Sequence, residues 1–249
     1  MQTIEIEKET TRPLLQVQGL EKYFQLHLLD GRIIRPLEGI SFKAWSGKLF
    51  IIGGRSGMGK TTILKCIYRT YLASGGNIWY DSEQFGPVDL ANAPEEVILK
   101  LRERELGYCS QFLKVLPRVS ALDVAAEPLM RRGIERAEAR SEAARWLARL
   151  DIEESRWQAF PVTFSGGEQQ RLNLIRAFIA APRLLLLDEP TASLDVRSKA
   201  LVLEMISEAR AAGVAIVTVS HDAAAFEKLA DDSYALGQTN ETTDLSIRN

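Results

Sequence analysis

Short apolar runs, each followed by glycine or a polar turn, mark the predicted strands of a buried sheet. They cover residues 49–52, 106–110, 184–187 and 215–219. Continuous apolar runs of this length are typical of strands that are covered on both faces, as in a parallel sheet. The segments at 60–67 and 165–177 have helical spacing instead. Strands that alternate with helices predict an α/β core.

The remaining segments complete one predicted domain over residues 14–236. Residues 14–45 predict strands around the Asp30-Gly31 turn, which would form a small antiparallel edge. The α/β core is expected from about 47 to 110 and again from about 180, with a mainly helical subdomain over about 112–165. Residues 1–13 are a polar extension, and residues 237–249 are a polar tail that we expect to be disordered.

The first apolar run leads into Gly-Arg-Ser-Gly-Met-Gly-Lys-Thr at residues 54–61. A strand, a glycine-rich loop and a helix in this order predict a phosphate-binding loop, because backbone N–H groups can surround a phosphate where a side chain would collide. The helix adds free N–H groups and its positive dipole end. The sequence therefore predicts ATP and Mg²⁺ as ligands. The predicted ATP-binding residues of this loop are Gly54, Ser56, Gly57, Gly59, Lys60, Thr61 and Thr62.

Within the loop, Lys60 is expected to reach the β- and γ-phosphate oxygens, and the Thr61 hydroxyl to ligate Mg²⁺. Two adjacent acids, Asp188 and Glu189, follow the leucine run at the carboxyl end of its strand, where α/β sheets bind ligands. We expect Asp188 to face the metal and Glu189 to orient the attacking water. Taken alone, such a pair can equally be two solvated acids at a turn.

Two further polar residues follow predicted strands. Gln111 comes after residues 106–110, and its amide is a candidate Mg²⁺ ligand. His221 comes after residues 215–219 and is a candidate partner for the γ-phosphate and for Glu189. An isolated Gln is usually surface and an isolated His is usually structural, so both assignments depend on position.

A second anion-binding segment begins the predicted helix at Ser165. Ser165 is a good N-cap residue, and the glycines after it leave the helix end open to an anion. One chain already has its phosphate loop, so a second anion site indicates a second copy of the chain around the nucleotide. The predicted ATP contacts here are Ser165, Gly166, Gly167 and Glu168.

In order and spacing, these segments resemble the nucleotide-binding domain of ATP-binding-cassette ATPases over roughly residues 14–236. The resemblance implies an α/β P-loop NTPase of the cassette type, ATP hydrolysis, and an ATP-sandwich dimer with itself or a related cassette subunit. It implies that Phe24, two positions after Lys22, stacks on adenine, although Tyr23 is its neighbour. It also implies that residues 192–195 form a loop that crosses to the partner.

A narrower resemblance concerns residues 110–124, residues 29–31 with 36–37, and residues 163–171, which look like cassette subunits of the bacterial carbon–phosphorus lyase system. It implies an accessory role in the formation of ribose 1-phosphonate 5-triphosphate from ATP and phosphonate, with soluble lyase subunits as partners. The alternative is the ATP-binding subunit of a membrane importer or lipoprotein-type exporter, with a permease as partner. A DNA-repair cassette is disfavoured, because the helical insert has no metal-ligand spacing and no long coiled coil.

Two positions depart from the general cassette signature, which usually begins with Leu and ends in Gln. Phe164 is a change in packing. Glu168 places a carboxylate near a bound polyphosphate, which would weaken nucleotide-driven closure or favour a contact with the partner's ribose.

Composition narrows the partners further. Lys plus Arg number 31 against 33 Asp plus Glu, so no basic field for nucleic acid is expected. The two cysteines, Cys66 and Cys109, form no metal spacing and are expected in the core.

No stretch approaches the ~20 apolar residues of a membrane span, and the acidic start predicts a cytoplasmic location without a signal peptide. Mixed charges over residues 131–150 predict a solvated helix face, with a docking surface as the alternative.

Overall fold

Two β-sheets of different kinds make up the centre of the computed structural model, which describes residues 12–26, 32–113, 118–221, 226 and 228–237. The parallel sheet has the order β6-β7-β8-β3-β9. Its strands are β3 Leu49–Gly53, β6 Leu106–Cys109, β7 Leu184–Asp188, β8 Ala215–Val219 and β9 Asp232–Ala235. The antiparallel sheet has the order β2-β1-β4-β5. Its strands are β1 Leu15–Leu26, β2 Arg32–Ala44, β4 Gly75–Ser82 and β5 Gly86–Asp89.

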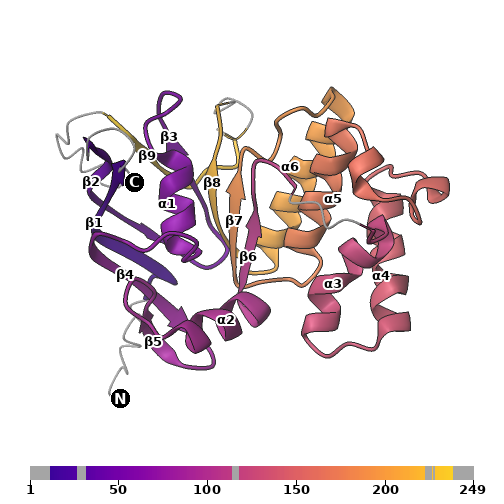
Figure 1. Cartoon of the computed structure of the whole chain (residues 1–249), viewed down its shortest axis with the longest axis horizontal. Coiled ribbons are helices and arrows are strands. Elements are labelled where there is room, and N and C mark those ends of the chain that lie inside the picture. Colours follow the sequence, from indigo (N-terminus) through magenta and orange to yellow (C-terminus); the bar gives the residue numbers. More distant parts are fainter. Residues whose placement is uncertain (1–11, 27–31, 114–117, 222–225, 227, 238–249) are drawn as a thin grey trace, which may run out of the picture.

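Six α-helices and two short 3₁₀ turns occur in the described residues. The helices are α1 Lys60–Ile67, α2 Glu95–Arg104, α3 Ala121–Arg131, α4 Arg136–Arg149, α5 Gly166–Phe178 and α6 Val196–Ala211, and the 3₁₀ turns cover Glu154–Arg156 and Pro161–Thr163. Figure 1 shows the antiparallel sheet at one end of the molecule and the α3–α4 pair at the other, with the parallel sheet between them.

The leucine run at 184–187 explains how the parallel sheet separates two cores. Side chains alternate along a strand, so neighbouring leucines point to opposite faces. Leu185 and Leu187 pack into the cluster formed with α3 to α6, whereas Leu184 and Leu186 pack into the cluster shared with α1 and the antiparallel sheet. All four are fully buried. A strand buried on both faces needs an unbroken apolar run, and the α/β prediction for this segment is confirmed.

The antiparallel sheet is larger than the sequence predicted. Residues 75–89 were assigned to the α/β core, but β4 pairs with β1, with Leu15 opposite Tyr80. This pairing joins residues 54 to 65 positions apart, from Glu21 with Gly75 to Leu15 with Tyr80, and the residues of β4 give no local indication of it. The Asp30-Gly31 turn, the N-terminal residues 1–11 and the tail beyond Gly237 lie outside the described residues.

Ion pairs link the helices of the helical part. The helix face over residues 131–150 that was predicted to be solvated is therefore partly engaged in contacts. Asp123 of α3 accepts from Arg136 and from Arg140 of α4. Arg149 at the end of α4 pairs with Glu208 of α6 at 2.7 Å. Ala139 and Ala143, both fully buried, let α4 approach its neighbours closely. Several of the charges on this helix therefore face other elements of the same chain.

The short segment at 103–105 joins the helical part to both sheets. Arg132, the C-cap of α3, donates to the carbonyl oxygens of Glu103 and Arg104 at the end of α2. The next residue, Glu105, is buried and accepts hydrogen bonds from Tyr80 and Ser82 of the antiparallel sheet. Because a helix end leaves its last carbonyl groups without partners, Arg132 satisfies two that α2 would otherwise leave open.

Two further predictions concern the whole chain. Cys66 and Cys109 are free and buried, as expected. Among the described helices, none combines the length and apolar character needed to span a bilayer.

Candidate functional site

The loop between β3 and α1 has the backbone that its glycines predict. Gly54, Gly57 and Gly59 have φ angles of 132°, 79° and 96°, in the region that side chains disfavour. A Cβ atom on Gly59 would lie 2.6 Å from the carbonyl oxygen of Pro36. Lys60 is buried, and its Nζ donates to the carbonyl oxygens of Gly54 at 2.7 Å and Arg55 at 3.0 Å. These hydrogen bonds close the loop around the ammonium group of Lys60.

The first turn of α1 presents backbone donors toward this loop. Its N-cap is Gly59, which has no side chain to accept from the helix, and the turn contains no acidic residue. The first N–H groups of a helix lack intrahelical partners, and together with the dipole they favour an anion. Thr61 and Thr62 lie in the same turn. These features fit a bound phosphate chain.

Asp188 at the end of β7 has each carboxylate oxygen held by a different hydroxyl group. Thr61 Oγ1 donates to Oδ1 at 2.8 Å, and the Tyr108 hydroxyl donates to Oδ2 at 3.3 Å. Burial raises the pKa of Asp188, and the negative charge of Glu189 adds to this, while the two hydrogen bonds oppose it. A hydroxyl and a carboxylate side by side are the hard oxygen ligands that Mg²⁺ takes together with phosphate oxygens and water. The residues present therefore fit the metal.

Glu189 contacts His221, which lies two residues beyond the end of β8. Its Oε2 accepts from the His221 backbone N–H at 3.1 Å, and its Oε1 lies 3.2 Å from His221 Nε2. Oε1 is buried and accepts no hydrogen bond in the described part of the chain. Glu189 itself has a φ of 53°, a left-handed conformation that is unusual for a side-chain-bearing residue. A buried carboxylate with one oxygen that accepts no hydrogen bond suits an acceptor for a proton from water.

Ser165 caps α5 in a complete capping box with Glu168. Glu168 Oε2 accepts from the Ser165 backbone N–H and from its hydroxyl, both at 2.8 Å, and the Glu168 N–H donates to Ser165 Oγ at 3.3 Å. Arg156 Nε lies 3.5 Å from Glu168 Oε1. Burial acts to raise the pKa of Glu168, but the bonds from Ser165 and the charges of Arg156 and Arg171 outweigh it and lower the pKa. The carboxylate folds back onto the helix end.

The structure brings some of the predicted residues together and leaves others apart. Thr61 contacts Asp188, and His221 contacts Glu189. In the described residues, no hydrogen bond joins Ser165 to the phosphate loop, and its hydroxyl bonds within the capping box. Gly167 lies close to the loop after Glu189, since a Cβ atom there would be 3.3 Å from the Ser193 carbonyl oxygen.

The predicted adenine-stacking residue, Phe24, is half-buried against the end of α1. Its ring meets Tyr71 edge-on with centroids 5.3 Å apart, and the Lys22 ammonium lies 4.8 Å from its centroid. Tyr23 is 49% exposed, so it has an open ring face. The stacking role of Phe24 stays a prediction.

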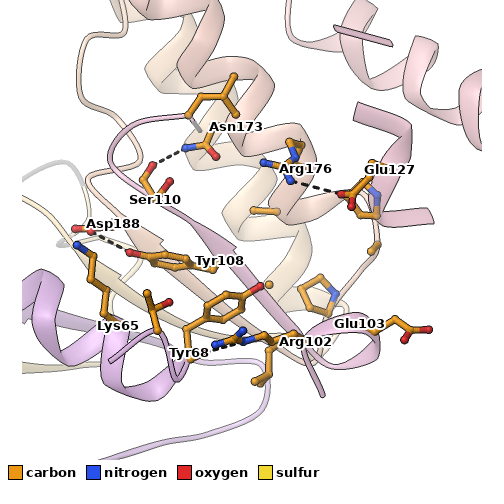
Figure 2. A pocket seen from close by; sticks show the side chains of 18 of the residues that line it. Lys65, Tyr68, Arg102, Glu103, Tyr108, Ser110, Glu127, Asn173, Arg176 and Asp188 are labelled. Atoms are coloured by element: carbon orange, nitrogen blue, oxygen red, sulfur yellow. Dashed lines mark hydrogen bonds and ion pairs between the residues drawn. The ribbon is translucent and has the colours of Figure 1, made fainter. Parts of the chain in front are cut away.

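A groove of about 670 Å³ runs from this site between the α/β core and the helical part. Asp188, Gln111 and Thr61 lie in its wall, and the exposed Phe112 lies beside them. Figure 2 shows Tyr108, Tyr68 and Arg102 in one row along the floor, with the Arg176–Glu127 pair opposite. Gln111 therefore stands where the candidate metal site opens into the groove.

Sequence reasoning missed several residues that hold this site in shape. Gln170 of α5 donates to the carbonyl oxygens of Glu189 and Pro190. Asn173, one turn further, donates to the carbonyl oxygen of Ser110, next to Gln111. Both are buried polar residues on a helix whose neighbours are apolar. Their helical spacing of three places them on one face, which was the only indication that the sequence offered.

Comparison with known proteins agrees with this geometry. A protein-family model described as ABC transporter matches residues 37–192. The lipoprotein-releasing system ATP-binding protein LolD of Shewanella sp. (strain MR-4) is 35% identical over 211 residues, which cover 84% of this chain and 87% of that protein. The dipeptide transport ATP-binding protein DppF of Escherichia coli (strain K12) is 26% identical over 226 residues, covering 89% of this chain and 66% of DppF.

Solved structures show the same fold. A dimeric structure of the ATP-binding cassette MJ0796 in a post-hydrolysis state, bound to ADP and Pi, superposes with a TM-score of 0.81 at 23% identity, covering 89% of this chain and 94% of that one. The predicted α/β fold with an antiparallel sheet and a helical part is confirmed. The family model and the relatives together show that the chain belongs to the ABC transporter family of ATP-binding cassette ATPases.

Proposed function

We propose that this chain binds ATP with Mg²⁺ in the loop at 54–61, pairs with a second cassette around the nucleotide, and hydrolyses it to drive a partner held in the groove. The observation that carries the proposal is the division of the two acids after β7. Asp188 is held beside Thr61 at the start of α1, whereas Glu189 faces His221 and keeps one buried oxygen, 3.2 Å from His221 Nε2, that accepts no hydrogen bond in the described residues. In such a pair, Asp188 can bind the metal while Glu189 accepts a proton from water.

The roles of the residues follow from their contacts. Lys60 would exchange its two loop carbonyl partners for β- and γ-phosphate oxygens. Thr61 and Asp188 would hold Mg²⁺, with Gln111 at the edge of the site, and Mg²⁺ would neutralise charge that develops on the phosphate oxygens. Glu189 would take the proton of the attacking water, and His221, whose N–H holds Glu189 Oε2, would position the acid and contact the γ-phosphate.

The partner cassette would supply Ser165 to Glu168. Several observations support a shared site. The helix end at Ser165 is exposed, and it makes no hydrogen bond to the phosphate loop of its own chain within the described residues. The similar MJ0796 cassette is dimeric. A homodimer places two such helix ends against two nucleotides, and the donors of each would stabilise transition-state charge on the partner's γ-phosphate.

Mixing two inactive variants tests the shared site. Ser165→Arg blocks the helix end, and His221→Ala removes the histidine of the core. In a mixed dimer, one site carries both lesions and the other carries neither, so mixing should restore part of the hydrolysis rate. Mixtures that form heterodimers and stay as inactive as their parents would contradict independent shared sites. A chain that stays monomeric with ATP while hydrolysis is blocked would exclude the shared site as an intrinsic property.

For the partner, we favour a membrane permease, so that the chain is the ATP-binding subunit of an importer or a lipoprotein-type exporter. LolD and DppF, the relatives named above, are ATP-binding proteins of a lipoprotein-releasing and a dipeptide transport system. The groove that opens at Gln111 has exposed aromatic and charged side chains for a docked segment. Thr61, Gln111 and Asp188 lie in the wall of this groove. A partner bound in the groove would therefore contact the same residues that are proposed to bind the nucleotide and Mg²⁺.

The second candidate is an accessory role in the carbon–phosphorus lyase system, with soluble lyase subunits as partners. The observation in its favour is the sequence of residues 110–124, which starts beside Gln111 and enters α3. Residues 110–113 of this segment line the same groove. Both candidates therefore predict that the partner touches Phe112, and they differ in the class of protein bound.

Affinity purification of the full chain from its host after membrane solubilisation separates the two candidates. A transporter subunit should bring down integral membrane proteins, whereas a lyase accessory subunit should bring down soluble lyase subunits. Phe112→Ala, which trims a groove side chain that is 76% exposed, should lose the partner. Ile33→Ala, which trims a side chain that is 51% exposed on β2, should retain it. Equal recovery with both variants would exclude the groove as the docking site.

A further inference from the structure

Tyr108 is a polar contact of the candidate metal site that lies outside every motif of the sequence. It belongs to β6, and its hydroxyl donates to Oδ2 of Asp188 at 3.3 Å (Figure 2). Thr61 Oγ1 donates to Oδ1 of the same carboxylate at 2.8 Å. Asp188 is 1% exposed, so these two hydroxyl groups are close partners of a buried carboxylate. The two hydroxyl groups therefore fix the plane of the carboxylate from opposite sides.

The ring that carries this hydroxyl is itself held in place. Tyr68 packs on Tyr108 with centroids 5.0 Å apart at 33°. The Arg102 guanidinium lies 4.7 Å from the Tyr68 centroid, and its Nε donates to the Tyr68 carbonyl oxygen at 2.9 Å. This tilted aromatic contact favours the observed orientation of the Tyr108 ring. The hydroxyl is thus aimed at Asp188 by the strand on one side and by the stack on the other.

We propose that Tyr108 is a positioning residue for Mg²⁺, which turns Oδ1 of Asp188 toward Thr61 and the phosphate loop by holding Oδ2. The proposal rests on the role of Asp188 toward Mg²⁺ proposed above. Outer-shell groups that hydrogen-bond a ligating carboxylate orient it, and their loss typically weakens metal binding by about 10- to 100-fold. Because the bond here is long, we expect an effect near the lower end of that range.

The competing explanation is that Tyr108 only fills space. Tyr108→Phe distinguishes the two, because it keeps the ring on Tyr68 and removes only the donor to Asp188. Tyr108→Leu removes ring and donor together. Tyr68→Phe is the matched control, since it removes a hydroxyl one ring away from the same stack and leaves the bond to Asp188 in place.

The experiment is the affinity of the full chain for ADP, measured by isothermal titration calorimetry in EDTA and at a series of Mg²⁺ concentrations. Tyr108→Phe should bind ADP in EDTA as the wild type does, and the gain in affinity that Mg²⁺ gives should fall about tenfold. Tyr68→Phe should show the wild-type gain. Tyr108→Leu should lose the Mg²⁺ gain to the same extent as Tyr108→Phe, whatever its loss of thermal stability.

Two results would overturn the proposal. The first is a Tyr108→Phe variant with the full Mg²⁺ gain, which would leave the proposed function intact and assign Tyr108 to packing. The second is a Tyr108→Phe variant that loses equal affinity in EDTA and in Mg²⁺, which would place the effect on the nucleotide site as a whole. A wild-type chain without any Mg²⁺ gain would refute the metal assignment of Asp188 as well, so the two failures are distinguishable.

Discussion

Replacing Glu168 with Gln should lower stability and strengthen ATP-driven dimerisation at the same time. In the wild type, Glu168 Oε2 accepts a hydrogen bond from Ser165 Oγ, with 2.8 Å between the two oxygens. This hydroxyl group is therefore not available to donate to a phosphate. Glu168 also carries a negative charge at the helix end where the partner's nucleotide is proposed to bind, and the lowered pKa keeps it ionised near neutral pH. Glu168→Gln removes this negative charge and replaces the carboxylate by an amide oxygen, which is a weaker acceptor for the Ser165 hydroxyl group.

The two effects have comparable size and opposite sign. Gln retains an acceptor for the capping box, so the cost is the loss of the charge at the helix N-terminus and beside Arg156, which lies 3.5 Å away. Each of these contributes a fraction of a kcal/mol, and we expect the free energy of unfolding to fall by about 1 kcal/mol. The amide oxygen of the variant holds the Ser165 hydroxyl less strongly than a carboxylate does, so the hydroxyl can turn to the phosphate instead. A hydrogen bond to a charged phosphate contributes about 1.5 kcal/mol at each of the two sites of a homodimer, so the dimer dissociation constant with ATP should fall on the order of 100-fold.

Urea unfolding measures the first effect, and sedimentation with ATP in a Glu189→Gln background measures the second. The control is Glu138→Gln, which removes an acid from the first turn of α4, a helix end with no proposed ligand. Glu138→Gln should lower stability by a smaller amount, since only the helix-end contribution is lost, and should leave dimerisation unchanged. A Glu168→Gln variant whose ATP-driven dimer is weaker than the wild-type dimer, or equal to it, would refute the reasoning about the captured hydroxyl.

Three further substitutions test the site and its support. Glu189→Gln should keep ATP binding, lower hydrolysis by at least about 10²-fold and trap an ATP-bound dimer, and near-normal turnover would remove Glu189 from its role. Lys60→Ala should abolish tight ATP binding in a titration without unfolding the chain, because the hydrogen bonds of its ammonium group within the described residues go to loop carbonyl groups; unchanged affinity with lost thermal stability would make the loop structural. Glu105→Gln should cost about 2 kcal/mol in urea unfolding at pH 7, because a buried carboxylate with several donors is lost. Since the pKa of Glu105 is lowered from its ordinary 4.5 by the Ser82 and Tyr80 bonds, against the effect of burial, its contribution is present above pH 4.5 and declines as pH falls through the folded-state pKa, a decline that Glu105→Gln should not show.

The parts of this fold that the sequence predicted are those with local causes. The helix at Lys60–Ile67 has the predicted bounds, because a glycine loop and a run with helical spacing fix both ends. The strand at Leu184–Asp188 is equally local, since four leucines need two covered faces. Ser165 caps α5 as predicted from residue type and the glycines that follow.

The parts that the sequence did not predict depend on pairing between distant segments. An aromatic residue in a strand is usually core, so nothing distinguished Tyr108 until β6 was placed beside β7, opposite Thr61. The capture of the Ser165 hydroxyl depends on which rotamer Glu168 takes, and the residue type allowed a contact with the partner's ribose equally well. In the sequence, Arg132 is one of many charged residues. Nothing near it indicates that it donates to the end of α2, about thirty positions away.

The phosphate loop is braced by the first and the last parts of the described cassette. Gly59 packs under the Pro36 carbonyl group of β2, and Gly54 packs against Leu236, whose N–H bonds the Gly53 carbonyl oxygen at 3.0 Å. A chain that has emerged from the ribosome only as far as β8 has the complete loop sequence and lacks one of these braces. Nucleotide binding should therefore appear late in synthesis, after β9 has joined the sheet beside β3, and a nascent chain would remain unable to hold ATP while its fold is still incomplete.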